Sequence, residues 1–192
     1  MQVYRYLTAI ICVLLLTLWG SPPVHANALR NAIYDGQIAK RNAFYNPSVP
    51  WIWAKAQLVA ESRLNTNATS PVGAMGLGQF MPDTWSQVRK ELGLPANASA
   101  YTSQYNIQAH AYYMNYLRSQ FKKPRPEVDR HSLALASYNA GLGNILKAQA
   151  KGGNSLLYSP MAKALPQVTG QHSKETTDYV QRIWEYVEVY SK

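Results

Sequence analysis

The residue best placed for chemistry in this sequence is Glu61, which ends an apolar stretch. Leu58, Val59 and Ala60 come directly before it, and a loop with several glycines follows it. Apolar surroundings disfavour an ionised carboxylate, so this group can be held protonated and can then donate a proton. Glycines let a ligand approach the backbone closely, as in a cleft. Position alone also allows a solvated glutamate at a helix end, and both interpretations stay open at this point.

The sequence gives little reason to expect a metal centre. Its candidate ligands His110, His131 and His172 lack a paired spacing such as HxxxH. The single cysteine, Cys12, lies within an apolar run near the N-terminus. We therefore expect neither a metal ion nor any other cofactor.

Three motifs follow one another along the chain. Residues 61–85 read ESRLNTNATSPVGAMGLGQFMPDTW, residues 134–144 read ALASYNAGLGN, and residues 175–180 read ETTDYV. The first resembles the signature of the soluble lytic transglycosylase family, in which a glutamate–serine pair precedes a GxxGLxQxMP loop. The second resembles the AYNAG segment of that family, and the third resembles its C-terminal tyrosine motif. The matching residues of the first motif are Glu61, Ser62, Gly73, Gly76, Leu77, Gln79, Met81, Pro82 and Thr84.

The resemblance covers residues 51–189 and departs from the family pattern in small ways. Thr66, Ser137 and Thr177 stand where proline, alanine and arginine are common, and none of the three removes a group that the chemistry needs. The resemblance implies a mainly α, lysozyme-like helical domain with little or no β-structure. It also implies a glycan-binding groove for strands of alternating N-acetylglucosamine and N-acetylmuramic acid.

The resemblance further implies that Glu61 acts first as acid and then as base. Most glycosidases need two carboxylates, yet the motifs offer no clear second one. Asp83 is nearest in sequence, but it follows Pro82 in a helical first turn, where an exposed acid is expected. The family instead uses the substrate's own N-acetyl group, closes a 1,6-anhydro ring and consumes no water.

Further residues are expected to bind substrate by motif match. Ser62 would hold the glycan or orient the catalytic carboxyl, and Gln79 would contact the N-acetyl region. Tyr138 and Asn139 would line the floor beside the scissile sugar, and Tyr179 would reach the carboxyl of Glu61. The alternative for each is structural: a backbone-bonded hydroxyl, a loop-stabilising amide, or ordinary packing and capping.

The periodicity of apolar residues predicts the helices that must position these groups. A folded loop or small hairpin is expected over 65–78, with Met75 and Phe80 as apolar cleft walls. A short helix is expected from 144, and mostly loop from 153 to 172. The other expected helices cover residues 28–41, 51–62, 82–92, 103–121, 133–140 and 174–190. We assign the tyrosines of 103–121 to core and groove wall, and we expect no nucleic-acid partner.

The N-terminus is typical of an export signal. An apolar run over 7–19 follows Arg5 and precedes a proline-rich exit and a small-residue pattern ending at Ala26. The run is shorter than the roughly 20 residues of a spanning helix. We expect a signal peptide over 1–26, an N-terminal extension with a short helix over 27–49, and a catalytic domain over 50–192. Cleavage after Ala28 stays open.

These features predict a periplasmic or secreted protein without stable membrane insertion after signal cleavage. The formal net charge of +9, which becomes +8 when Arg5 is removed with the signal peptide, would attract anionic wall polymers, although it can also serve solubility alone. The main alternatives are a lysozyme-type muramidase and a wall-binding scaffold of a secretion or conjugation apparatus. Such an apparatus is also a candidate partner. A phage or secreted lytic effector stays possible as well.

Overall fold

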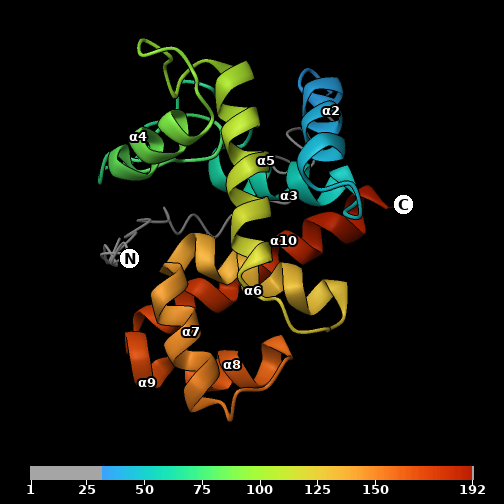
Figure 1. The fold of residues 1–192 in the computed structure, drawn as a ribbon, viewed down its shortest axis with the longest axis vertical. Coiled ribbons are helices and arrows are strands. Elements are labelled where there is room, and N and C mark those ends of the chain that lie inside the picture. The colour runs from blue at the N-terminus through green and yellow to red at the C-terminus, as the bar shows by residue number, and fades with distance from the viewer. Residues whose placement is uncertain (1–31, 192) are drawn as a thin grey trace, which may run out of the picture. The chain divides into compact units, whose positions relative to one another are not determined.

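The computed structural model describes residues 32–191. The expected signal peptide, 1–26, and the start of the first expected helix lie outside these residues. The helices, labelled as in Figure 1, are α2 (Asp35–Tyr45), α3 (Trp51–Ser62), α4 (Pro82–Glu91), α5 (Ser103–Ser119), α6 (Glu127–Ala140), α7 (Leu142–Lys151), α8 (Tyr158–Ala164), α9 (Pro166–Thr169) and α10 (His172–Tyr190). The described part contains isolated β-bridges and no named strand, which confirms the mainly α fold class.

The described residues divide into two compact units. Residues 32–115 and 182–191 form the first, here called the α3 unit. Residues 116–181 form the second, here called the α6 unit. Helices α5 and α10 each contribute residues to both units.

Helix α3 is the buried centre of its unit. Pro50 precedes it with φ −55° and ψ 127°, a conformation that suits the residue before a first helical turn. The helix ends where Arg63 and Leu64 both adopt left-handed conformations, with φ 55° and 61°. It has the bounds expected from sequence, and α2 packs against it. Its buried residues are Ala54, Lys55, Ala56, Gln57, Leu58 and Val59.

A buried lysine joins the helices of the α3 unit. Lys55 is 3% exposed, and its Nζ lies 2.8 Å from Oδ1 of Asp35 at the start of α2. The same Nζ lies 4.9 Å from the ring centroid of Tyr190 and 6.0 Å from that of Trp51. Cation–π attraction and the ion pair together offset the cost of burying the ammonium group. Lys55 therefore links α2, α3 and the end of α10.

Replacement of this lysine is expected to destabilise the protein. Lys55→Met keeps the apolar stem but leaves the carboxylate of Asp35, 27% exposed, without its cation. We expect the free energy of unfolding to fall by about 2–3 kcal/mol, measured by urea denaturation. Lys174→Met is the matched control, because Lys174 and Asp178 form an exposed pair whose loss costs about 0.5 kcal/mol or less. Equal losses in the two variants would contradict this role for Lys55.

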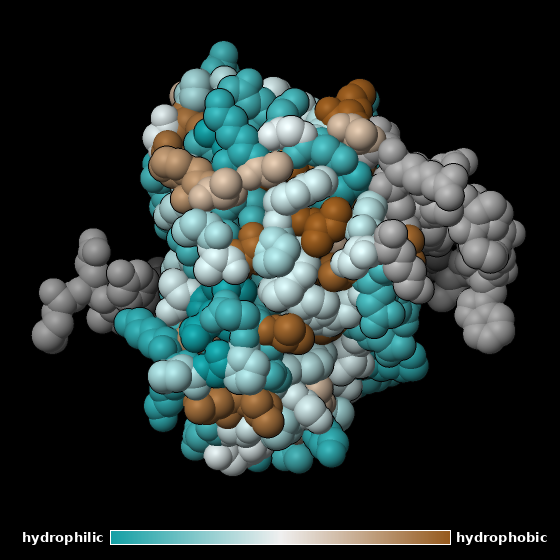
Figure 2. Space-filling view, turned by 90° about the vertical axis from the view of Figure 1, so that its right-hand side faces the viewer, coloured by the Kyte–Doolittle hydropathy of each residue, from teal (hydrophilic) through white to brown (hydrophobic). Residues whose placement is uncertain are grey.

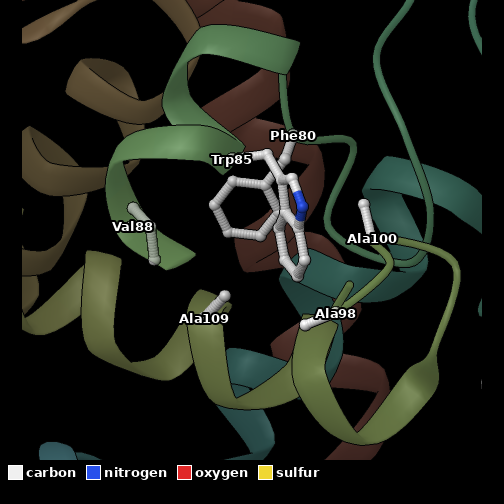
Figure 3. Close-up of a cluster of buried hydrophobic side chains, with 6 residues drawn as sticks. All are labelled: Phe80, Trp85, Val88, Ala98, Ala100 and Ala109. Atoms are coloured by element: carbon white, nitrogen blue, oxygen red, sulfur yellow. The ribbon is translucent and has the colours of Figure 1, made fainter. Parts of the chain in front are cut away.

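The loop after α3 leads into a compact apolar cluster. Figure 3 shows the Phe80 and Trp85 rings packed together beside small alanine side chains. These alanines come from the loop between α4 and α5 and from α5 itself. The ring centroids lie 5.8 Å apart with planes at 63°, an edge-on arrangement that favours aromatic pairs. Phe80 is only 2% exposed, so the expectation that it forms a cleft wall is wrong. Met75 is partly buried against the same cluster.

Helix α4 follows the expectation closely. Pro82 stands in its first turn, and Asp83 is an exposed acid of that turn, as expected. Gly93, with φ 61°, follows the helix end. Helix α5 also begins as expected, at Ser103, and ends two residues early.

His110 on α5 makes stability depend on pH. It is 1% exposed, and burial lowers its pKa to about 3 from the ordinary value of 6.5. Between pH 6.5 and about pH 3, the unfolded chain therefore binds one more proton than the folded protein does. The stability that depends on neutral His110 is complete above pH 6.5 and is lost as the pH falls through this range. We expect the unfolding free energy to fall by up to about 1.4 kcal/mol per pH unit in that window.

Urea denaturation across this pH range tests the effect. His110→Leu is expected to flatten the slope, whatever its effect on absolute stability. His172→Gln, made at an exposed histidine, is the matched control and is expected to keep the slope. An unchanged slope in His110→Leu would assign the acid sensitivity to other groups.

The α6 unit is built around α7, which packs against α6, α8 and α9 (Figure 1). Helix α6 begins at Glu127, six residues before the expected start, because Pro126 precedes its first turn and two acids favour its positive end. Helix α7 begins at Leu142 instead of 144, because Gly141, with φ 85°, already turns the chain.

The expectation of mostly loop between 153 and 172 is wrong. This stretch contains α8 and α9. Met161, Ala164 and Leu165 are buried at a helical spacing, and Pro166 begins α9. These helices are too short for the periodicity of apolar residues to indicate them.

Helix α10 begins two residues earlier than expected, at His172. Glu175 is in its first turn, and Asp178, one turn later, forms an ion pair with Lys174. The C-terminal half belongs to the α3 unit, where the Trp184 ring meets that of Trp53 at 4.8 Å.

Candidate active site

Glu61 and Ser62 form the last turn of α3 and are both half-buried. The residues before Glu61 are strongly buried, Leu58 at 0% and Val59 at 1% exposure. The Ser62 hydroxyl donates to the Leu58 carbonyl at 3.4 Å, a long bond. Glu61 therefore stands on a rigid helix whose preceding turn is anchored in the core.

The loop after Glu61 is held by its own backbone. Phe80 and Met75 exchange N–H···O bonds of 2.9 and 3.0 Å, and the Gly76 N–H donates to the Ala68 carbonyl at 2.8 Å. The Ser70 hydroxyl accepts from the Ala74 N–H at 2.9 Å. These bonds confirm a folded loop over 65–78.

Asn106 of α5 anchors this loop from outside. Its side chain is fully buried, and its Oδ1 accepts from the Gly78 N–H at 2.8 Å. Its Nδ2 donates to the carbonyls of Ala100 and Met75, at 2.7 and 3.4 Å. One amide thus joins the loop to the segment before α5.

Gly76 lies against the same anchor. Its φ of 70° is in the left-handed region, and a Cβ there would lie 2.1 Å from the Ala100 oxygen and 2.6 Å from Nδ2 of Asn106. The position therefore admits only glycine without a shift of the backbone.

Gln79 is built into the loop. It is 8% exposed, with φ 48°, and its Nε2 donates to the carbonyls of Gly76 and Ala68 at 2.9 and 3.2 Å. These contacts show a loop-stabilising amide. Because Nε2 of Gln79 is used in this way, Oε1 would be the atom that contacts an N-acetyl group.

The other three expected site residues lie in the α6 unit and are buried. Tyr138 and Asn139, near the end of α6, are 5% and 6% exposed, and Tyr179 on α10 is 4% exposed. Oδ1 of Asn139 accepts a hydrogen bond of 2.8 Å from the Thr176 hydroxyl. The structure thus places Asn139 beside the ETTDYV segment, so two of the three sequence motifs meet in this unit.

Three other acids of the α3 unit have positions or partners that are explained by a structural role. Asp35 pairs with Lys55, and Asp83 is exposed in the first turn of α4. Glu91 accepts hydrogen bonds from Gln87 and Tyr112. Glu61 differs from these three because it stands at the end of a buried helix.

Within residues 32–191, no group of three or more His, Cys, Asp or Glu side chains is placed to hold a metal ion. No helix in the same range is long and apolar enough to span a membrane.

Asn106 was not among the residues expected to shape the site. The available signal was its position on α5, where it shares a face with Ala109 and Tyr113 at helical spacing. A polar residue on an apolar face must find buried partners, and here those partners are loop backbone groups.

Comparison with known proteins gives consistent similarities. The family model described as the transglycosylase SLT domain matches residues 39–157, more than half of the chain. The chain is 30% identical over 139 residues to membrane-bound lytic murein transglycosylase F of Shewanella halifaxensis, covering 70% of this chain and 28% of that protein. It is 32% identical over 105 residues to the protein of the same name from Mannheimia succiniciproducens, covering 55% and 20%. It therefore spans less than a third of either relative.

Solved structures of lytic transglycosylases are also similar to this chain. An inactive mutant of the lytic transglycosylase Slt from Pseudomonas aeruginosa aligns with a TM-score of 0.66 and 28% identity, covering 83% of this chain and 24% of that one. A complex of the 70-kDa soluble lytic transglycosylase with bulgecin A aligns with a TM-score of 0.65 and 25% identity, over the same shares.

Proposed function

The chain belongs to the transglycosylase SLT family, and on that basis we propose that it is a peptidoglycan lytic transglycosylase. It cleaves the β-1,4 bond between N-acetylmuramic acid and N-acetylglucosamine without water and leaves a 1,6-anhydromuramic end. The observation that carries this proposal is the position of Glu61, half-buried on the last turn of a buried helix and followed by an anchored glycine loop.

The chemistry needs one proton carrier. Protonated Glu61 gives its proton to the glycosidic oxygen, so the C1–O4 bond breaks and the N-acetylglucosamine leaves with a free hydroxyl. The carbonyl oxygen of the muramic N-acetyl group bonds to C1 and stabilises its positive charge. The Glu61 carboxylate then takes the proton from the C6 hydroxyl, and O6 displaces the N-acetyl oxygen at C1. Glu61 ends protonated, and atoms and charge balance.

The surroundings of other acids support a single catalytic carboxylate. Asp35 is held by a lysine, and Asp83 points from an exposed helix start. The Pseudomonas relative was solved as an inactive glutamate-to-glutamine mutant, so one glutamate is essential in that protein. We propose Glu61 for the corresponding role here.

We propose substrate contacts for the other matching residues. Ser62 orients the Glu61 carboxyl or binds the glycan, and Gln79 presents Oε1 to the N-acetyl group. Tyr138, Asn139 and Tyr179 also contact the glycan or the catalytic carboxyl. The bond from Thr176 fixes the orientation of the Asn139 amide, so Nδ2 would be its donor toward a sugar.

We further propose that the protein acts on the wall outside the cytoplasm, after removal of residues 1–26. The relatives are named as membrane-bound murein enzymes, which supports a substrate in the cell envelope. A secretion or conjugation apparatus stays a candidate partner.

Digestion of purified sacculi by residues 27–192 tests the function. We expect soluble glycan fragments to appear without a matching rise in reducing ends, because the anhydro ring blocks the new end. Fragments with one reducing end per cleavage would indicate a muramidase. Release of no fragments would contradict an autonomous enzyme and favour the scaffold alternative.

A further inference from the structure

Two loops of the α6 unit lie side by side at the starts of α6 and α8. The Arg125 guanidinium donates to the Leu156 carbonyl at 3.2 Å. Four residues further on, the Asp129 carboxylate accepts from the Tyr158 backbone N–H at 2.7 Å. These bonds fix the segments 122–129 and 156–158 against each other.

Two apolar side chains are exposed where these segments meet. Val128 is 51% exposed and Leu157 is 45% exposed, and each directly precedes a residue of the Asp129–Tyr158 hydrogen bond. On the face shown in Figure 2, hydrophobic residues form separate patches among hydrophilic ones. Single exposed apolar residues are common on protein surfaces. A binding role for Val128 and Leu157 therefore depends on the charged residues of the same segments.

The segment 122–129, which contains Val128, carries exposed cationic side chains. Lys122 and Lys123 are exposed in the same segment as Val128. The nearby acids are occupied inside the unit, since Glu127 binds Arg118 and Arg130, and Asp129 binds the start of α8. The α6 unit as a whole has nine lysines and arginines against four acids.

We propose that Lys122, Lys123, Val128 and Leu157 form a docking surface for an anionic lipid membrane, here called the basic–apolar patch. The lysines meet headgroup phosphates, and the two apolar side chains enter the boundary between headgroups and acyl chains. A soluble phosphate polymer would satisfy the lysines but would gain nothing from exposed valine and leucine. The combination therefore favours a lipid surface, and it does not depend on the proposed catalytic function.

Co-sedimentation of residues 27–192 with vesicles tests this proposal. We expect binding to phosphatidylcholine vesicles that contain phosphatidylglycerol, weaker binding at high salt, and little binding to phosphatidylcholine alone. Lys122→Gln with Lys123→Gln is expected to weaken binding by about fivefold per lysine. Val128→Ser with Leu157→Ser is expected to weaken it by at least about tenfold.

Matched variants separate the patch from general charge and hydrophobicity. Lys40→Gln with Lys90→Gln removes the same charge from exposed sites of the α3 unit, and Leu146→Ser with Val189→Ser removes exposed apolar groups elsewhere. Both controls are expected to bind within about twofold of the parent chain. Equal losses in patch and control variants would overturn the proposal. Binding to soluble polyphosphate without binding to vesicles would overturn it in favour of a polyanion site.

Discussion

Glu61→Gln is expected to reduce fragment release from sacculi by at least about 10³-fold, because the same group both donates and accepts a proton in the proposed cycle. Glutamine keeps the size of the side chain and its place on the last turn of α3. Its amide, however, cannot protonate the glycosidic oxygen. The folded structure is expected to persist, so circular dichroism and the urea midpoint serve as checks on folding.

Glu188→Gln is the matched control for this variant. Glu188 is an exposed acid on α10 in the same unit, so its replacement changes the net charge equally. We expect its release rate to stay within about twofold of the parent, because surface changes away from a site have small effects. A Glu61→Gln variant that retains a tenth or more of the parent rate would exclude Glu61 as the acid.

Gly76→Ala is expected to be the most destabilising of the small substitutions considered. The added Cβ would lie 2.1 Å from the Ala100 carbonyl oxygen and 2.6 Å from Nδ2 of Asn106, both parts of the loop anchor. Either the loop moves or the Asn106 bonds break, and the residue also has a φ of 70°. We expect a loss of about 3 kcal/mol or more in unfolding free energy. Because the loop follows Glu61, fragment release should fall as well.

Gly73→Ala separates packing from backbone strain. Gly73 has a φ of 87° in the same loop, but a Cβ there meets nothing within 4 Å. The unfolding free energy of Gly73→Ala is therefore expected to fall by only about 1 kcal/mol, which is the cost of alanine in a left-handed conformation. Urea denaturation of both variants measures the difference. Equal losses would mean that backbone conformation, and not the contact with Ala100 and Asn106, makes Gly76 necessary.

The sequence predicted the long elements well, for physical reasons that individual helices illustrate. Helix α3 follows Pro50 and has apolar residues at helical spacing up to Ala60, so the sequence predicts its bounds correctly. Helix α4 has proline at its start and glycine after its end. In contrast, α8 and α9 were missed because seven and four residues are too few for a periodic pattern.

The candidate site was predictable only in part. The motifs indicated Glu61 and its loop, but sequence spacing does not show that Gln79 uses Nε2 to hold the loop. Nor does it show that the loop depends on Asn106, whose partners are backbone atoms distant in sequence. Phe80 lies within the first motif at a position that the family pattern does not specify. It packs in the core, because an apolar residue beside a cleft and one beneath it have the same sequence pattern. The roles of Tyr138 and Tyr179 stay predictions.

Mass spectrometry of fragments released in heavy-oxygen water tests the central claim most directly. If Glu61 directs an intramolecular attack by O6, the fragments end in anhydromuramic acid, contain no heavy oxygen at C1, and are absent with Glu61→Gln. Fragments with a reducing muramic end that carries heavy oxygen would show that water attacks C1, and the non-hydrolytic mechanism would then be wrong.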